Sequence, residues 1–262
     1  MTAAPHDGGL AARPAAPHDR ELAARPAFYA LRPGGWRDLV TLLHPPYTAW
    51  HLSYVALGTA AVPGVIHATR LGAALGAFFL AVGIGAHALD ELNGRPLRTA
   101  LGRGLLIGLG AGGVLGGVAI GIAGIIVVSP LLAPLVVAGG VIAPAYNLEL
   151  LRGRLHGDFW FALAWGAFPA FTGYFVQTLT VRPAGVAVAG ACFLLSVAQR
   201  RLSTPVRELR RRTAEVRGEQ RLTDGTLVTL DRERLSAPLE GALSALWLAL
   251  VLLAVGLLVA RL

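Results

Sequence analysis

Residues 105–146 read LLIGLGAGGVLGGVAIGIAGIIVVSPLLAPLVVAGGVIAPAY and contain no charged side chain. About 20 apolar residues are enough to cross the hydrocarbon core of a membrane, so this stretch is long enough for two crossings. We expect the division between them near Ala119–Gly124. An uncharged stretch of this length predicts an integral membrane protein.

The rest of the chain follows the same pattern. Of its 262 residues, 55% are hydrophobic and 15% are charged, whereas about 25% of the residues in a soluble domain are charged. The sequence therefore predicts an all-α, polytopic helical bundle within 34–262, embedded in lipid, with about seven transmembrane helices. The apolar windows that predict these helices are 47–66, 68–89, 100–120, 122–145, 159–180, 184–199 and 237–260.

The 23 basic residues are all arginine, and their distribution predicts the topology. With a cytoplasmic N-terminus, seven spans leave only Arg70, Arg182 and Arg261 outside, which the positive-inside rule strongly prefers. The predicted location is the inner membrane of the cell. The basic residues flank the spans and do not form one face, so a nucleic-acid partner is not expected.

Two N-terminal segments precede the first apolar window. Residues 1–33 carry LAARPA at 10–15 and again at 22–27, and this Pro/Ala/Arg composition predicts a disordered tail. Residues 34–46 predict a short amphipathic helix at the membrane interface. The first residues lack the pattern of a cleavable signal peptide.

The polar segment 200–236 precedes the last apolar window. Within it, 205–217 predicts a basic helix on the membrane surface, and 221–232 predicts a β-hairpin that turns at Asp224–Gly225. We expect the whole segment to form a cytoplasmic loop that caps the bundle.

Ionisable side chains gather at the predicted cytoplasmic ends of the spans. They are costly at membrane depth and predict a functional site where helices converge. His87 and Glu91 share one helical face, with Asp90 one step round. As an alternative, these groups lie in hydrated headgroups and Asp90 pairs with Arg95 or Arg98. The candidate metal ligands are His44, His51, His87, Asp90, Glu91, Glu149 and His156.

Several stretches within 40–218 resemble the UbiA superfamily of intramembrane prenyltransferases. HPPYTAWHLSYVALGTAAV at 44–62 is similar to the family's first helix, with His44 in place of an arginine. GAHALDELNGRPLRTALGRG at 85–104 resembles the first aspartate-rich motif. In that motif His87 stands for the asparagine and Glu91 for the first aspartate, while Arg95 occupies the position of the second carboxylate.

The stretch 152–178, RGRLHGDFWFALAWGAFPAFTGYFVQT, resembles the menaquinone-type branch of the family. The second aspartate motif departs from the pattern, because Leu202 and Val206 stand where its two aspartates are expected and Gln199 lies near the place of its asparagines. The resemblance therefore implies the family's bundle but only part of its metal shell.

The resemblance implies transfer of an isoprenoid from its diphosphate to an acceptor at a cytoplasm-facing metal site. Mg²⁺ is the metal expected from the family, and arginines can partly replace a metal in holding a diphosphate. Asp158 is the implied residue that orients the acceptor or stabilises the carbocation, and Tyr146 is a second candidate catalytic residue. The implied substrate-binding residues are Asn93, Arg95, Arg98, Arg152, Arg154, Tyr174 and Gln177.

Two alternatives remain open. The histidines shift the metal preference from Mg²⁺ toward iron or zinc, which suits an enzyme that acts on a quinone or lipid without diphosphate chemistry. Loss of the second motif also suits a homologue that only binds lipid or a membrane partner.

Overall fold

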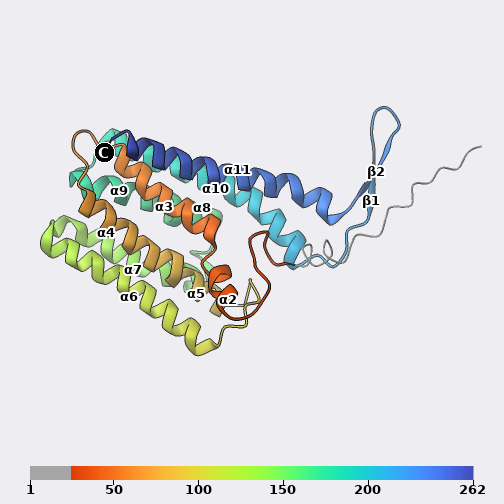
Figure 1. Cartoon of the computed structure of the whole chain (residues 1–262), viewed down its shortest axis with the longest axis horizontal. Helices are drawn as coiled ribbons and strands as arrows, with labels where there is room; N and C mark the ends of the chain where they lie inside the picture. Colours follow the sequence, from red (N-terminus) through yellow and green to blue (C-terminus); the bar gives the residue numbers. More distant parts are fainter. Residues whose placement is uncertain (1–24, 262) are drawn as a thin grey trace, which may run out of the picture.

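The computed structural model describes residues 25–261, and these form a bundle of long helices (Figure 1). Six helical stretches are long and apolar enough to cross a membrane, which confirms the predicted all-α polytopic fold. These stretches are Ala68–Leu92, Arg103–Val127, Pro130–Asn147, Asp158–Thr178, Pro183–Arg211 and Arg232–Val259.

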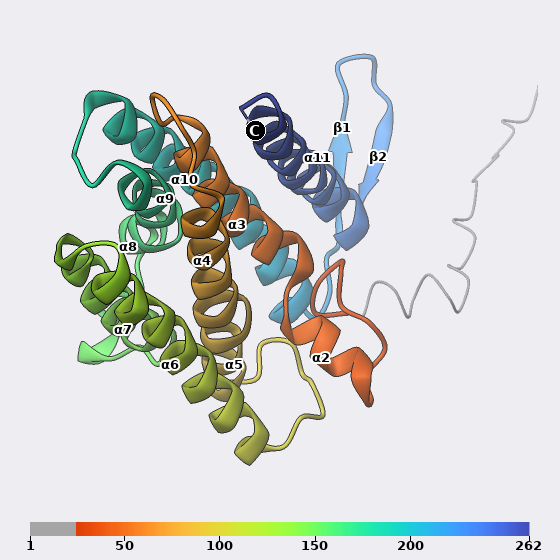
Figure 2. The same ribbon diagram turned by 60° about the vertical axis from the view of Figure 1, so that its left-hand side comes forward.

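The first predicted span, 47–66, is shorter than expected. It corresponds to α3 (Pro45–Ala60), 16 residues long, which is about 24 Å at 1.5 Å per residue. The helix ends before Pro63, because a residue that precedes proline is disfavoured in the helical conformation. Trp50, Tyr54 and Val55 are fully buried. Thus α3 is a central helix of the bundle, packed against α4, α9, α10 and α11 (Figure 2).

The uncharged stretch 105–146 does divide into two helices, but not at Ala119–Gly124. The helix α6 (Arg103–Val127) runs through those glycines, and α7 (Ala133–Asn147) follows a short 3-10 turn, η2 (Pro130–Leu132). Ser129 caps that turn, since its hydroxyl accepts a hydrogen bond from the Leu131 amide at 3.2 Å. The chain divides at the Ser129-Pro130 pair and not at the glycines, because glycine is tolerated inside membrane helices.

Two of the spanning stretches contain a π-helical segment. The first joins α4 (Ala68–Phe78), η1 (Phe79–Ala86) and α5 (His87–Leu92). The second joins α8 (Asp158–Ala162), η4 (Leu163–Ala167) and α9 (Phe168–Thr178). A Cβ atom on Gly113 of α6 would lie 2.5 Å from the Leu80 carbonyl oxygen of η1. This close approach of backbones, which only small residues permit, fixes η1 against α6.

The C-terminal part differs from two predictions. The helix α10 (Pro183–Arg211) continues through Pro205, so the basic stretch 205–217 begins inside a bundle helix and is not a separate surface helix. The predicted hairpin is confirmed as β1 (Gly218–Arg221) paired antiparallel with β2 (Leu227–Leu230). It projects away from the helices before α11 (Arg232–Val259), so it does not cap the bundle (Figure 1).

The N-terminal residues that the structure describes are packed. Residues 1–24 of the predicted disordered tail lie outside the described residues, but Ala27 and Ala30 are buried with Leu97. The predicted interfacial segment 34–46 contains α2 (Trp36–Leu42), whose Trp36 is exposed and whose Asp38 is buried. Residues 25–33 therefore belong to the bundle.

Candidate functional site

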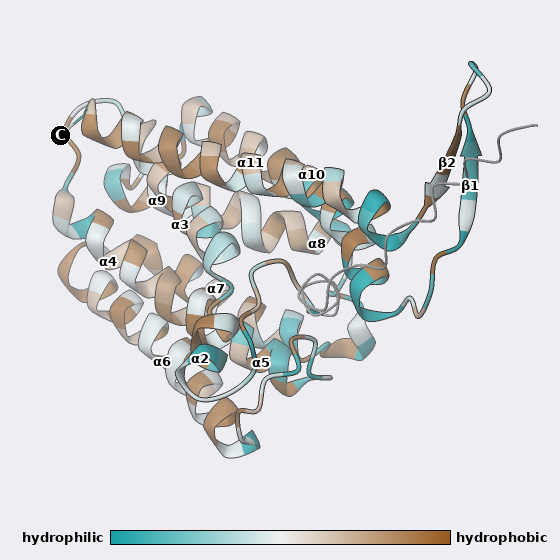
Figure 3. Cartoon of the chain, turned by 45° about the vertical axis from the view of Figure 1, so that its right-hand side comes forward, coloured by the Kyte–Doolittle hydropathy of each residue, from teal (hydrophilic) through white to brown (hydrophobic). Residues whose placement is uncertain are grey.

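A polar cavity of about 440 Å³ lies at the end of the bundle where the start of α3, α5, the end of α7 and the last turns of α10 meet. Hydrophilic residues gather at this end of the molecule (Figure 3). The N-terminal residues Pro26–Tyr29 form part of the wall. The polar and ionisable side chains that line it include His44, His51, His87, Asp90, Tyr146, His156, Gln199, Arg200, Arg207, Glu208, Arg211 and Arg212.

One wall of the cavity is cationic. Among the described lining residues, α10 and the residue after it supply four guanidinium groups, whereas Asp90 and Glu208 supply two carboxylates. Arg207 donates to the Thr204 hydroxyl at 3.0 Å, and Arg211 donates through Nε to the Pro26 carbonyl at 3.2 Å. An arginine carries five N–H donors, so both retain donors that can bind an anion.

This wall is not predicted by the sequence, because the arginines after Pro205 are expected in a separate helix on the membrane surface. The signal was present in their spacing. Arg200, Arg207 and Arg211 are separated by seven and four residues, and such positions share one face of a continuous helix. Arg200 is held at the rim by Asp158, at 2.9 Å between Nε and Oδ1.

The neighbours Asp90 and Glu91 face different surroundings. Asp90 lines the cavity with His87. Glu91 is fully buried, and its carboxylate accepts hydrogen bonds from the Leu97 amide at 2.9 Å, the Thr99 amide at 2.8 Å and the Thr99 hydroxyl at 2.9 Å. The prediction that Glu91 is a metal ligand is therefore wrong, because the loop after α5 occupies its carboxylate.

The loop that Glu91 holds is also tied to the N-terminal helix. Buried Asp38 of α2 accepts hydrogen bonds from the Gly34 amide at 3.1 Å and the Ala100 amide at 3.2 Å. The carboxylates of Glu91 and Asp38, from two different helices, thus hold this loop in place. They pair backbone N–H groups that would be costly to leave unpaired in a buried site.

The four histidines predicted as ligands all line the cavity. His51 Nδ1 lies 2.8 Å from the Trp165 carbonyl oxygen of η4, and His87 Nδ1 lies 3.1 Å from the Gly83 carbonyl oxygen of η1. His156 Nδ1 lies 3.1 Å from the Tyr146 carbonyl oxygen. Three of these imidazoles are thus anchored through Nδ1, and two of their anchors belong to π-helical segments, which often occur at functional sites.

The fourth histidine, His44, stacks on His87 with ring centroids 4.1 Å apart. It precedes α3 in a left-handed conformation, with φ 46°. Burial, followed by the proximity of His87 and Arg211, holds the pKa of His44 well below its usual value of 6.5. His44 is therefore neutral at physiological pH.

The donor set does not fit the Mg²⁺ site that the sequence resemblance implies. Mg²⁺ prefers oxygen ligands, and the described lining residues offer two carboxylates beside four guanidinium groups, whose charge opposes a cation. Within 25–261, no three or more His, Cys, Asp or Glu residues are arranged to hold a metal ion. Glu149, the remaining predicted ligand, is exposed and does not line the cavity.

The predicted phosphate-binding arginines lie outside the cavity lining. Arg95 donates to the Thr99 carbonyl at 3.1 Å and to the Leu101 carbonyl at 2.6 Å, within its own loop. Asn93 donates to the Asn147 carbonyl at 3.2 Å. Arg98 and Arg152 occupy loop positions with positive φ, and Arg154 follows Arg152 in its loop. These residues therefore do not line the polar cavity, whose arginines belong to α10 and the residue after it.

Three other predicted site residues do not line the polar cavity. Gln177 lies at the opposite end of α9, where its side-chain oxygen accepts from the His67 amide at 2.9 Å. Tyr174 is buried against Gly185, and neither residue lines the cavity. The Asp158 side chain is 73% exposed and holds Arg200 from outside. Tyr146, in contrast, lines the cavity, and its buried hydroxyl has no hydrogen-bond partner among the described residues.

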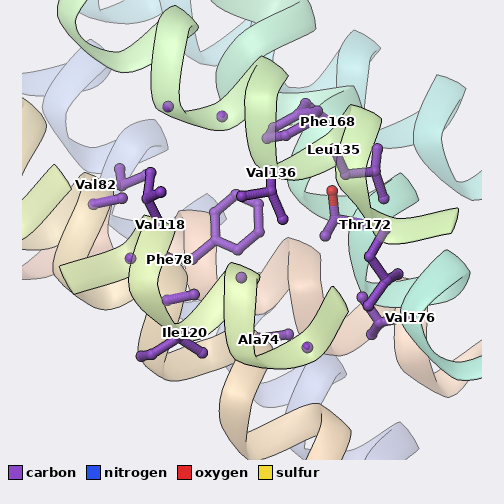
Figure 4. Close-up of a pocket in the computed structure, with 18 of the residues that line it drawn as sticks. Ala74, Phe78, Val82, Val118, Ile120, Leu135, Val136, Phe168, Thr172 and Val176 are labelled. Atoms are coloured by element: carbon purple, nitrogen blue, oxygen red, sulfur yellow. The ribbon is translucent and has the colours of Figure 1, made fainter. Parts of the chain in front are cut away.

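A second, apolar cavity of about 140 Å³ adjoins the polar one. Val82 and Trp165 line both. It extends along α4 as far as Arg70, a separation of 12 residues from Val82 that corresponds to about 18 Å of helix. Figure 4 shows Phe78 across its centre and Thr172 with its hydroxyl turned inward. Within 25–261 the buried Thr172 hydroxyl has no hydrogen-bond partner.

No family model, no curated protein and no solved structure matches the chain.

Proposed function

We propose that this protein binds a lipid with a phosphate or diphosphate head inside the membrane and acts on it, with prenyl transfer as the reaction class. The observation that carries the proposal is the cationic wall of α10 beside an apolar cavity. Guanidinium groups bind phosphate oxygens in charge-assisted pairs, and the apolar cavity suits a hydrocarbon chain.

The head of such a ligand matches the polar cavity, and its hydrocarbon chain matches the adjoining apolar cavity. A head bound by Arg207 and Arg211 would leave its chain to pass Val82 and Trp165. The resemblance to the UbiA superfamily adds support, because Gln199 and Val206, at the position of its second aspartate motif, line the polar cavity.

The arginines also suit the chemistry of the leaving group. In prenyl transfer the bond between C1 of the isoprenoid and the diphosphate oxygen breaks, and negative charge accumulates on the departing diphosphate. Fixed guanidinium groups stabilise that charge where it develops. We assign this role to Arg207 and Arg211, with Arg200 at the rim.

We further propose that the polar end faces the cytoplasm. Arg70, Arg182 and Arg261 lie at the opposite end, where Arg70 donates to the Val176 carbonyl at 3.3 Å and Arg261 donates to the Ala60 carbonyl at 3.0 Å. The remaining arginines of residues 25–261 then obey the positive-inside rule.

The test uses the full chain in lipid nanodiscs. Geranylgeranyl diphosphate is the probe, geranylgeraniol is the neutral control, and release of inorganic diphosphate reports the reaction. We expect the diphosphate to bind, the alcohol to bind at least about tenfold more weakly, and inorganic diphosphate to compete. Equal binding of the alcohol and the diphosphate would refute the proposal.

A further inference from the structure

His51 has a fixed tautomer. Its Nδ1 lies 2.8 Å from the Trp165 carbonyl oxygen, and a carbonyl oxygen can only accept a hydrogen bond. Nδ1 therefore carries the proton and Nε2 keeps its lone pair. Among the described residues, no group forms a hydrogen bond with Nε2, so this nitrogen is free to accept a proton.

The position of His51 is the second observation. It is 5% exposed and lines the polar cavity, and its ring centroid lies 6.1 Å from that of Trp165. Trp165 also lines the apolar cavity. A lipid with its head at Arg211 and its chain beyond Trp165 would carry its reacting carbon past His51.

The other anchored histidines are less suited to accept a proton. His87 stacks on His44 and lies within reach of a second backbone carbonyl, that of Leu43. His156 lies flat on the Tyr146 ring, with centroids 4.5 Å apart. The titratable groups that face His51 are His44 and His87 from other segments and Tyr54 on its own helix.

We propose that Nε2 of His51 is the general base that removes the proton from a hydroxyl-bearing acceptor. The acceptor O–H proton passes to Nε2, the acceptor oxygen forms a bond to C1 of the isoprenoid, and the C1–diphosphate bond breaks. Its electron pair leaves with the diphosphate, held by the arginines. This inference rests on the proposed function. It adds the class of the second substrate, a molecule with a hydroxyl group, of which water is the smallest.

The test separates the base from the anchor. His51→Asn keeps an amide N–H that can donate to the Trp165 carbonyl but has no basic nitrogen. His51→Ala opens space for added imidazole. His67→Asn is the matched control, because His67 is exposed at the opposite end of the bundle.

The measurements are binding of geranylgeranyl diphosphate, diphosphate release with water, a simple phenol or a long-chain alcohol, and the pH–rate profile. We expect His51→Asn to bind the probe within about twofold of the wild type and to react about 100-fold more slowly or worse. The acidic limb of its profile should disappear, and imidazole should restore rate to His51→Ala. His67→Asn should match the wild type.

Wild-type rates in His51→Asn, or slow His51→Ala that imidazole does not rescue, would overturn the inference. A wild-type protein that binds the diphosphate but turns over with none of the acceptors would also overturn it, while leaving diphosphate binding in place. Failure of the wild type to bind the probe at all would instead refute the proposed function.

Discussion

The two adjoining cavities share Val82 and Trp165 but differ in nearly everything else. The polar cavity is walled by guanidinium, imidazole and phenol groups, and its backbone supports are held by buried carboxylates. The apolar cavity is walled by alanine, glycine, aliphatic and aromatic side chains, with Arg70 at its far end. A single ligand that satisfies both walls needs a charged head and a hydrocarbon chain.

The contrast also shows where the chain spends its few charged residues. In a membrane an unpaired ionisable group is expensive, so the charges that gather around the polar cavity mark a place where they have partners or ligands. Among its described lining residues the apolar cavity has one charged side chain, Arg70, which donates to the Val176 carbonyl.

The largest effect is expected from removing the cationic wall. The double substitution Arg207→Ala and Arg211→Ala should weaken binding of a lipid diphosphate by about 100-fold or more, because two charge-assisted contacts are lost. Titration calorimetry in nanodiscs measures the change. The matched control is Arg217→Ala with Arg221→Ala on the projecting hairpin, which removes the same charge from exposed positions. Equal losses in the two double variants would mean that net charge, and not this wall, attracts the ligand.

Next in size is the effect of Glu91 on the support of the polar cavity. In the wild type one carboxylate oxygen of Glu91 accepts two hydrogen bonds and the other oxygen accepts a third. Glu91→Gln replaces one of these oxygens with an NH₂ group, which cannot accept them. We expect the free energy of unfolding to fall by about 2–4 kcal/mol, since a buried donor loses its charged partner. Thermal unfolding in detergent measures this loss. Glu149→Gln, on an exposed loop, should change little; an equally small change for Glu91→Gln would contradict the assigned role.

Filling the apolar cavity should separate chain binding from head binding. Thr172→Phe should weaken binding of geranylgeranyl diphosphate by about tenfold and leave binding of inorganic diphosphate unchanged, because an added ring occupies the space of the chain. Thr172→Val keeps the shape and removes a buried hydroxyl without a partner among residues 25–261, so it should stabilise the fold by up to about 1 kcal/mol. If Thr172→Phe weakens both ligands alike, the two cavities are not occupied by one molecule.

The smallest effect is the pH dependence that His44 contributes. Because its pKa in the folded state is lowered by burial, the unfolded state binds the proton more readily once the pH falls below 6.5. The free energy of unfolding is therefore unaffected by this group above that pH and falls below it, by up to about 1.4 kcal/mol per pH unit. The difference in unfolding temperature between about pH 7.5 and about pH 5.5 should be smaller in His44→Asn. A difference equal to that of the wild type would show that His44 is not the group that titrates.

The fold was largely predictable because the length of an apolar run decides whether it crosses a membrane. The ends of the helices, which depend on local backbone geometry, were not predictable in the same way. The end of α3 before Pro63 and the start of η2 at Pro130 are decided by single prolines, and Pro205, which reads as a helix start, lies inside α10.

The site was predictable as a gathering of side chains at one depth but not as a set of directions. His44, His51, His87, Asp90, His156 and Tyr146 do line one cavity. Asp90 and Glu91 are adjacent in sequence, so a helix turns them about 100° apart, and only the course of the loop at 97–99 decides that Glu91 faces away from the cavity. The α10 arginines depended on the same unpredicted continuation through Pro205.

The N-terminal wall of the polar cavity has a consequence for the order of biosynthesis. The Pro26 carbonyl meets Arg211 across 185 residues of chain, and Arg210 binds the Arg25 carbonyl while paired with Glu240 of the last helix. Arg25 and Pro26 are thus synthesised long before Arg210 and Arg211, the residues that bind their carbonyls. The lining of the polar cavity is complete only when Arg212 has been made, so a nascent chain stalled before α10 lacks the cationic wall.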